Sequence, residues 1–367
     1  MPRPSNIYRR VVQVLVVGLV MGACGPAQAP TATPDRPSSA AGASETVLDI
    51  YNWGTFIDPQ VVSDFAAAYS VKVNYEIYDN DAALLADLEA KTQNRDVIFP
   101  SDYMVAIMRE KGLLHALNKA NMPNIANLDP IFTNTPYDPG NRYCVPFQWG
   151  TLGIGYNIKA TGRVLTSWND LFDPAFKGRV ALLDDARASL GAMLINLGYS
   201  PNTINPAEIA RARDLIQANL ASIAVFAPDT GQDLLLSGTV DLALEWSGDI
   251  LQVSKANPDI RYVIPDRGSF ITTTYICVAG DADHAALAEQ FVNYVLEPKV
   301  SAQISNFILY STPNSAAIPF LNQADRENPM IYPPVRIREA LHFLVDVGAD
   351  NAAIYDQAWA DILAAQR

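Results

Sequence analysis

LDIYNWGTFIDP, residues 48–59, changes from a strand pattern to a helix start. Leu48 and Ile50 alternate with more polar residues, which predicts a short strand with a buried face. The residues Asn-Trp-Gly-Thr interrupt this pattern, and the Asp-Pro that follows is typical of the first turn of a helix. Open α/β sheets place their ligand crevice at such switches, outside the carboxyl ends of the strands. Trp53 is therefore a candidate wall residue of a binding site, although a lone Trp is also common in a core.

The segments that follow repeat this alternation of strand and helix. Strand patterns at 71–78 and 96–100 alternate with helical patterns at 58–70, 81–93 and 101–112. This order predicts a parallel sheet with helices on both faces.

Further along, a long strand is expected at 144–157, and shorter strands are expected at 180–183 and within 240–249. A chain of 367 residues is long enough for two domains or lobes. We expect an α/β fold of two lobes joined by crossing strands. Their expected segments are 47–150 plus 272–318 for lobe 1, and 151–271 plus 319–367 for lobe 2.

The N-terminus has the layout of an export signal. Three Arg residues precede the apolar run VVQVLVVGLVMGAC, which is too short for a confident membrane span. Its last four residues resemble a bacterial lipobox, although an incidental Cys after ordinary cleavage is the alternative. We expect a signal peptide at 1–23, then lipidated Cys24 and a disordered tether through 46, rich in Pro, Ala, Ser and Thr. The protein would be anchored on the outer face of the cytoplasmic membrane, in the periplasmic space of a cell with two membranes.

Charge and cysteine content narrow the class of partner. Cleavage before Cys24 removes three Arg and lowers the formal charge from −13 to −16. Such acidity argues against nucleic acid and anionic lipid and is compatible with a cationic ligand. Cys144 and Cys277 both fall on expected strands of an exported chain, so a disulfide and two buried free thiols both stay open.

Motifs for catalysis or metal binding are weak. The three His residues are scattered without a zinc spacing, and no G-x-S-x-G or P-loop occurs. Asp184 and Asp185 could serve as an acid and a base, but neighbours on a strand point to opposite faces. A hydrolase is thus the less favoured class, and we expect no enzyme, metal or cofactor.

Aromatic and acidic residues recur at strand ends. Aromatic faces attract alkylammonium groups by about 0.5–2 kcal/mol each, and a carboxylate adds a charge-assisted hydrogen bond. Asp249 could instead cap a helix over 250–255. The residues expected just past strand ends are Trp53, Ser101, Tyr103, Asp185, Trp246 and Asp249.

Several segments resemble the extracytoplasmic spermidine/putrescine-binding proteins of ABC transporters. The resemblance is carried by YNWGTFID, DVIFPSDY, YCVPFQWGTLGIGYN, TSWNDLFDPAFKGRVALLDDAR, LEWSGD, YSTPNSAA and DVGADNAAIYD. It implies a two-lobed periplasmic-binding-protein fold of type II, a clamshell that closes on ligand. It also implies a monomeric receptor for a small organic cation that delivers its ligand to an ABC permease.

The resemblance implies a set of ligand-binding residues. The aromatic residues would enclose the alkyl part of an amine, and two Asp residues would hold its nitrogen ends. The set is Trp53, Thr55, Phe56, Ser101, Tyr103, Asp185, Trp246, Asp249, Thr273 and Tyr310.

Three positions depart from the family pattern. A family Glu corresponds to Ala188, a Trp-x-Asp corresponds to residues 271–273, and a Gln corresponds to Leu344. Because an unpaired buried ammonium costs several kcal/mol, the loss of these acids makes tight spermidine binding doubtful. We expect a less acidic and more apolar pocket, with a ligand of one or two positive centres. A less charged ligand and a sensory lipoprotein without transport are the alternatives, whereas ferric iron is disfavoured because no Tyr-Tyr pair occurs.

Overall fold

The computed structural model describes residues 46–366, and the expected signal peptide, Cys24 and nearly all of the tether lie outside this range. The strands are β1 (Val47–Trp53), β2 (Lys72–Tyr78), β3 (Val97–Ile98), β4 (Cys144–Asn157), β5 (Val180–Leu183), β6 (Ile223–Ala227), β7 (Leu242–Trp246), β8 (Ile260–Val263), β9 (Ser269–Val278) and β10 (Leu341–His342). The helices are α1 (Pro59–Tyr69), α2 (Asp81–Ala90), α3 (Asp102–Glu110), α4 (Ile158–Thr161), α5 (Ala186–Asn196), α6 (Pro206–Ala218), α7 (Gly231–Leu236), α8 (Ser247–Ala256), α9 (Ala285–Val295), α10 (Pro298–Ile308), α11 (Gln323–Arg326), α12 (Val335–Arg338) and α13 (Ala349–Gln366).

The expected alternation at the start of the chain is confirmed. Strand β1 pairs in parallel with β2 and β3. Helix α1 begins where the Asp-Pro pair predicts, because the Asp58 side chain accepts a hydrogen bond from the Gln60 N–H and Pro59 occupies the first turn. The Trp at the end of β1 is therefore placed at a strand-to-helix switch.

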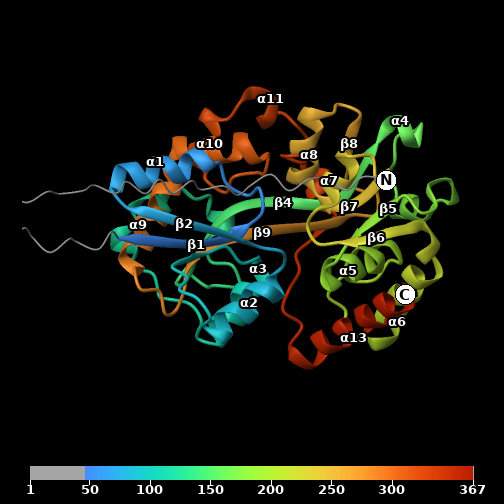
Figure 1. The fold of residues 1–367 in the computed structure, drawn as a ribbon, viewed down its shortest axis with the longest axis horizontal. Coiled ribbons are helices and arrows are strands. Elements are labelled where there is room, and N and C mark those ends of the chain that lie inside the picture. Colours follow the sequence, from blue (N-terminus) through green and yellow to red (C-terminus); the bar gives the residue numbers. More distant parts are fainter. Residues whose placement is uncertain (1–45, 367) are drawn as a thin grey trace, which may run out of the picture. The chain divides into compact units, whose positions relative to one another are not determined.

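Two long strands connect the two lobes. The sheet order is β2-β1-β3-β9-β4-β7-β5-β6. The first part of β4 pairs antiparallel with β9, and its second part pairs antiparallel with β7 and β8. In Figure 1, β4 and β9 run across the middle, between the group that contains β1 and the group that contains β5 and β6. This arrangement is the two-lobed α/β fold of type II.

Each lobe has its own hydrophobic core. Leu48, Phe65 and Phe291 belong to a core on the side of β1, whereas Trp168 and Tyr355 belong to a core on the side of β5. The two cores thus lie on opposite sides of the crossing strands β4 and β9.

The segment after residue 319 departs from the expected boundary. Leu321 packs with Ala302 and Ala317 next to α10, and the Ser311 hydroxyl donates to the Ile331 carbonyl. The chain therefore stays with lobe 1 past residue 319, and only its later part, which includes α13, packs on lobe 2.

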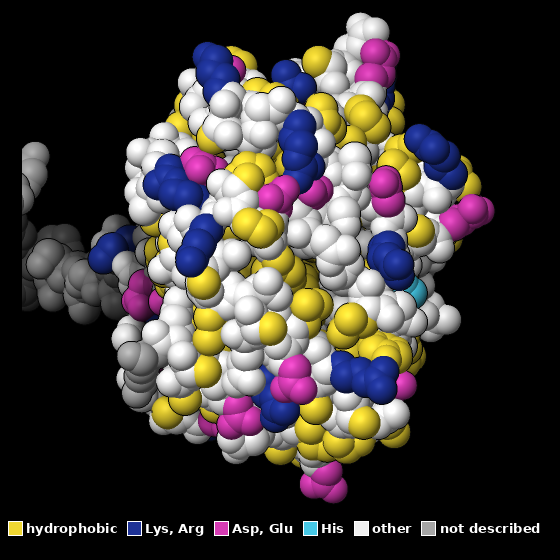
Figure 2. Space-filling model, turned by 90° about the vertical axis from the view of Figure 1, so that its right-hand side faces the viewer, with side chains coloured by type: hydrophobic (Ala, Val, Ile, Leu, Met, Phe, Trp, Pro, Cys, Tyr) yellow, Lys and Arg dark blue, Asp and Glu magenta, His cyan; other side chains and the backbone are white. Residues whose placement is uncertain are grey.

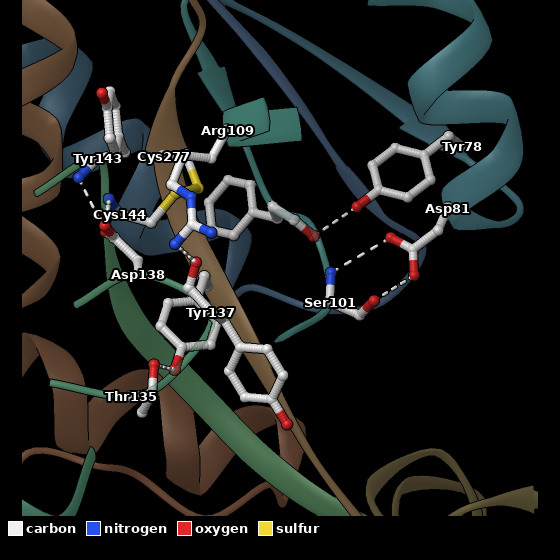
Figure 3. Close-up of a disulfide and its surroundings, with 12 residues drawn as sticks. Tyr78, Asp81, Ser101, Arg109, Thr135, Tyr137, Asp138, Tyr143, Cys144 and Cys277 are labelled. Carbon is white, nitrogen blue, oxygen red and sulfur yellow. Dashed lines mark hydrogen bonds between the residues drawn. A yellow bond between two sulfur atoms is a disulfide. The ribbon is translucent and has the colours of Figure 1, made fainter. Parts of the chain in front are cut away.

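A disulfide joins the two crossing strands at the lobe 1 end. Cys144 of β4 and Cys277 of β9 are register partners and are bonded to each other. Figure 3 shows the bond beside Asp138, whose carboxylate accepts hydrogen bonds from the N–H groups of Tyr143 and Cys144 at 2.8 and 2.9 Å. Of the two alternatives that the sequence left open, the structure has the disulfide.

The outer surface shows mixed charge. On the face drawn in Figure 2, basic and acidic side chains are interspersed, and neither sign forms a broad field. In the part of the chain that the structure describes, no helix has both the length and the apolar character needed to cross a membrane.

Candidate ligand-binding cavity

A cavity lies between the lobes at the carboxyl ends of several strands. Lobe 1 contributes the end of β1, the turn between β2 and α2, and the start of α3. Lobe 2 contributes the ends of β5, β6 and β7. The expectation from open α/β sheets, that the crevice lies outside the carboxyl strand ends, describes this position.

Aromatic side chains form the walls. The Trp53 ring packs on Tyr78 with 4.6 Å between ring centroids, and its Nε1–H donates to the Phe99 carbonyl at 2.8 Å. Trp246 lines the cavity from the end of β7. Both Trp rings are only partly buried, so their faces are available to a ligand.

Tyr310 forms a further wall and is held by packing on glycine. Its ring lies 4.8 Å from that of Phe56, measured between centroids. A Cβ atom at Gly248 would come within 1.9 Å of the Tyr310 ring, and one at Gly150 within 2.6 Å. Both glycines are therefore required for the close approach of this ring.

Asp249 joins the two lobes through hydrogen bonds. The Tyr310 hydroxyl donates to Oδ2 at 2.5 Å, and the Thr55 hydroxyl donates to Oδ1 at 3.2 Å. Helix α8 begins at Ser247, so Asp249 lies in its first turn. The alternative that Asp249 caps a helix over 250–255 is therefore wrong.

The other acidic groups are held by hydrogen bonds from backbone and side-chain donors. Asp185 caps α5 by accepting the Ala188 N–H at 2.8 Å, and Asp184 accepts the Trp359 Nε1–H at 2.8 Å. Asp81 opens α2, and both of its oxygens accept from Ser101, one from the N–H at 3.2 Å and one from the hydroxyl (Figure 3).

The cavity is more acidic than the sequence suggested. Within residues 46–366, the carboxylates that line it are those of Asp79, Asp81, Asp184, Asp185, Asp229 and Asp249. No Lys, Arg or His among these described residues lines it. The cavity thus has four carboxylates besides those of Asp185 and Asp249, the two that were expected to hold the ligand. Apolar Ala188 and Leu344 do line the wall, but further carboxylates come from the turns after β2 and β6, which the sequence prediction did not include.

Burial and mutual repulsion raise the pKa values of several of these acids. Burial raises the pKa of Asp81 to about 6 and the pKa of Asp249 to about 6. Burial and the charge of Asp249 raise the pKa of Asp229 well above its usual range, and burial does the same for Glu245 behind it. Carboxylate oxygens of Asp229, Glu245 and Asp249 all lie within 4.8 Å of one another. A cationic ligand would relieve both the repulsion and the desolvation.

Most of the expected site residues come together here. Thr55 contacts Asp249 without lining the cavity. The residues that line it as expected are Trp53, Phe56, Ser101, Tyr103, Asp185, Trp246, Asp249 and Tyr310.

Thr273 is not brought to this cavity. It lies on β9 and lines a second cavity on the opposite face of the strand, together with Ile271 and Tyr275. Its neighbours Thr272 and Thr274 line the first cavity instead. Successive residues of a strand point to opposite faces, so Thr273 faces away from the cavity that its two neighbours line.

The residues that sequence reasoning missed had a usable signal. Asp79 and Asp81 directly follow β2, and Asp229 follows β6 closely, so all three satisfy the strand-end rule that selected the others. The strand ends of β2 and β6 were not among those from which the sequence prediction took its site residues.

A two-lobed α/β body with an aromatic and acidic cavity between its lobes defines a solute-binding protein. A family model for bacterial extracellular solute-binding proteins matches residues 60–327, and the chain belongs to this family.

Individual relatives cover almost the same region. The chain is 32% identical to the spermidine/putrescine-binding periplasmic protein of Salmonella typhimurium, over 87% of this chain and 92% of the relative. It is 31% identical to the putrescine-binding periplasmic protein SpuD of Pseudomonas aeruginosa, over 88% and 93%. Among solved structures, the spermidine/putrescine ABC transporter substrate-binding protein PotD of Streptococcus pneumoniae matches with a TM-score of 0.75 and 28% identity, over 88% and 100%. These relatives are solute-binding proteins, not enzymes.

Proposed function

We propose that this protein captures a polyamine or a related small organic cation and delivers it to the permease of an ABC importer. One observation carries the proposal: a cavity with aromatic walls is lined by carboxylates and, among the described residues, by no basic side chain. A cation is the ligand that such a cavity stabilises best. The names of the relatives favour polyamines within this class.

In the proposed mechanism, the ligand lies between the lobes. Trp53, Trp246 and Tyr310 pack on its methylene groups, and Asp185 and Asp249 receive its nitrogen ends. Ser101, Tyr103 and Phe56 shape the wall. Thr55 holds Asp249 by a hydrogen bond, whereas Thr273 has no part in the contact. Closure of the lobes about β4 and β9 then excludes water from the ion pairs, which strengthens them.

The acidity of the cavity bears on ligand choice. Spermidine carries three ammonium groups, each of which needs a partner when it is buried. The carboxylates around the cavity are numerous enough for a diamine or a triamine. This number of carboxylates supports spermidine as well as putrescine as a candidate ligand.

A hydrolase is the less favoured alternative. Asp185 is engaged as a helix cap and Asp184 as the acceptor of an indole N–H. Both carboxylates thus serve as acceptors of protein N–H groups, which is a structural role and does not favour a role as general base.

Export and anchoring complete the proposal. The signal peptide and lipidated Cys24 would hold a monomeric receptor on the outer face of the cytoplasmic membrane. Mass spectrometry of the protein from membranes tests this directly, because a diacylglycerol on Cys24 adds a defined mass that a Cys24→Ser variant lacks.

Calorimetry tests the ligand class. The purified protein would be titrated with putrescine, spermidine, agmatine and choline, and with succinate as an anionic control. We expect at least one amine to bind and succinate to give no heat. Binding of an anion or a sugar, with no binding of any amine, would contradict the proposal. Stimulation of permease ATPase activity by the loaded receptor separates transport from a purely sensory role.

A further inference from the structure

Two carboxylates from opposite lobes face the same cavity. Asp81 begins α2 in lobe 1, and Asp185 caps α5 in lobe 2. Both line the cavity, and the charge of Asp185 contributes to the raised pKa of Asp81. The two groups therefore interact across the space that a ligand would occupy.

Asp81 is buried without a cation. Asp81 is 4% exposed, and its two oxygens accept hydrogen bonds from the N–H and the hydroxyl of Ser101, which is a neutral residue. Neutral donors offset part of the desolvation of a carboxylate, but an opposite charge offsets much more. A buried charge of this kind is costly to the empty protein, which indicates that it serves a ligand.

A second pair has the same arrangement. Asp79 of lobe 1 and Asp229 of lobe 2 both line the cavity, and the charge of Asp79 contributes to the raised pKa of Asp229. Acidic groups of the two lobes thus face each other across the cleft at two places, so it is costly for both members of a pair to be charged in the closed form without ligand.

We propose that Asp81 is an ammonium-binding residue that acts with Asp185 across the cleft, so that a cation between them changes repulsion into attraction and makes closure depend on the ligand. This inference rests on the proposed function, since it assigns a further ligand contact to the same cavity. A ligand shifts a conformational equilibrium only by its differential affinity for the two states. An ammonium that contacts both lobes has this property, because the open form can offer it only one of the two carboxylates.

The test compares two variants that lose the same charge. Asp81→Asn keeps the shape of the side chain and an oxygen acceptor for Ser101. Asp64→Asn is the matched control, because Asp64 is exposed on α1, outside the cavity, and accepts a hydrogen bond from the Gln60 side chain. We expect Asp81→Asn to weaken putrescine binding by about tenfold or more, and Asp64→Asn to bind as the unmodified protein does.

Two further readouts separate an ammonium contact from a structural role. Under the proposal, ligand-free Asp81→Asn melts at or above the temperature of the unmodified protein, because an uncompensated buried charge is gone. Asp81→Glu, which keeps the charge, should regain part of the affinity. In small-angle scattering, putrescine should decrease the radius of gyration of the unmodified protein at concentrations that leave Asp81→Asn unchanged.

The outcomes are distinguishable. Equal putrescine affinity of Asp81→Asn and the unmodified protein would overturn the inference and leave the proposed function intact. A fall in both affinity and ligand-free melting temperature, without recovery in Asp81→Glu, would assign Asp81 a structural role and overturn it as well. If the unmodified protein binds no amine, the proposed function itself fails.

Discussion

A substitution at Trp246 tests how much an aromatic wall contributes to ligand binding. Its ring lines the cavity from the end of β7 and is only partly buried. Trp246→Ala should weaken putrescine binding by about 5- to 30-fold, since a cation over an aromatic face gains about 0.5–2 kcal/mol and packing on the methylenes adds to it. Calorimetry measures the change. Phe307→Ala is the control, because Phe307 is exposed on α10 and lies outside the cavity; an equal loss in both variants would contradict the role of Trp246.

The carboxyl group of Asp249 makes ligand binding depend on pH. Burial raises its pKa to about 6, and the groups that face it are Asp229, Glu245, Tyr310 and Thr55. A raised carboxyl pKa means that the proton is bound more tightly in the folded state, so the stability of the empty protein falls as pH rises from about 4 through 6. The melting temperature without ligand should therefore rise when the pH is lowered from 7 to 5.

Amine binding should show the opposite dependence. The ammonium needs the charged carboxylate, so putrescine affinity should increase as pH rises from 5 to 7. Calorimetry at three pH values checks this, with Asp249→Asn expected to flatten the profile. Affinity that is independent of pH in the unmodified protein would show that these acids do not contact the ligand.

Individual site residues were predictable to the extent that strand ends are visible in the sequence. Trp53 and Trp246 follow clear strand patterns, and both line the cavity. Thr273, which the resemblance implied, lines the second cavity because it lies on the opposite face of β9 from Thr272 and Thr274. Asp81 and Asp229 were missed although they obey the strand-end rule.

At the scale of elements, the packing of α8 on Tyr310 depends on Gly248. In an ordinary helix position, Gly→Ala stabilises by about 0.5–1 kcal/mol. Here the new Cβ atom would collide with the Tyr310 ring, whose hydroxyl donates to Asp249. Gly248→Ala should therefore weaken putrescine binding by about tenfold, through loss of roughly 1–2 kcal/mol of packing and hydrogen bonding. Lys255→Ala, at the exposed end of α8, is the control, and unchanged affinity in Gly248→Ala would refute this account of the Tyr310 wall.

The disulfide stabilises the crossing strands without contributing to the cavity. It closes a sequence separation of 133 residues, and neither cysteine lines the cavity. Replacing both Cys144 and Cys277 by Ser should lower the free energy of unfolding by about 2–5 kcal/mol, measured by urea titration. Putrescine affinity at low temperature should stay within about threefold of the original, a change below 1 kcal/mol. A large loss of affinity without a loss of stability would contradict this separation of roles.

Elements with a strong local signal were predicted well. The long strand at 144–157 appears where expected. The start of α8 was misplaced because Ser247 and Gly248 carry no apolar pattern, and the helix begins there without a side-chain cap. Local pattern predicts the interior of an element better than its end.

At the scale of the whole molecule, the crossing strands separate two cavities. Thr272 and Thr274 face the first cavity, whereas Ile271 and Thr273 face the second. When lobes rotate about such strands, closing one side opens the other. A wedge in the second cavity should therefore favour the closed form.

Ile131→Trp is a suitable wedge. Ile131 lines the second cavity and is 70% exposed, so a larger side chain can be accommodated without disturbing the core. We expect putrescine affinity to rise by about two- to fivefold, which corresponds to a shift of less than 1 kcal/mol in the closing equilibrium. Ile204→Trp, at a position that is 59% exposed and lies outside both cavities, should change nothing. Weaker binding in Ile131→Trp would show that the second cavity does not open on closure.

The two-lobed architecture was predictable because the order of strands and helices restricts the topology strongly. The acidity of the cavity was not. Its carboxylates come from turns far apart in the chain, such as those at Asp81 and Asp229, and their convergence depends on how the lobes close together. The segment after residue 319 also followed lobe 1 because of packing with α10 that no sequence pattern announces.

The central claim is that positive charge, held by these carboxylates, is what the cavity selects. Calorimetry with putrescine and with 1,4-butanediol tests it most directly, because the two molecules share a four-carbon chain and differ in their charged ends. The account predicts measurable binding of putrescine and none of the diol under the same conditions. Equal binding of both molecules, or binding of the diol alone, would contradict it.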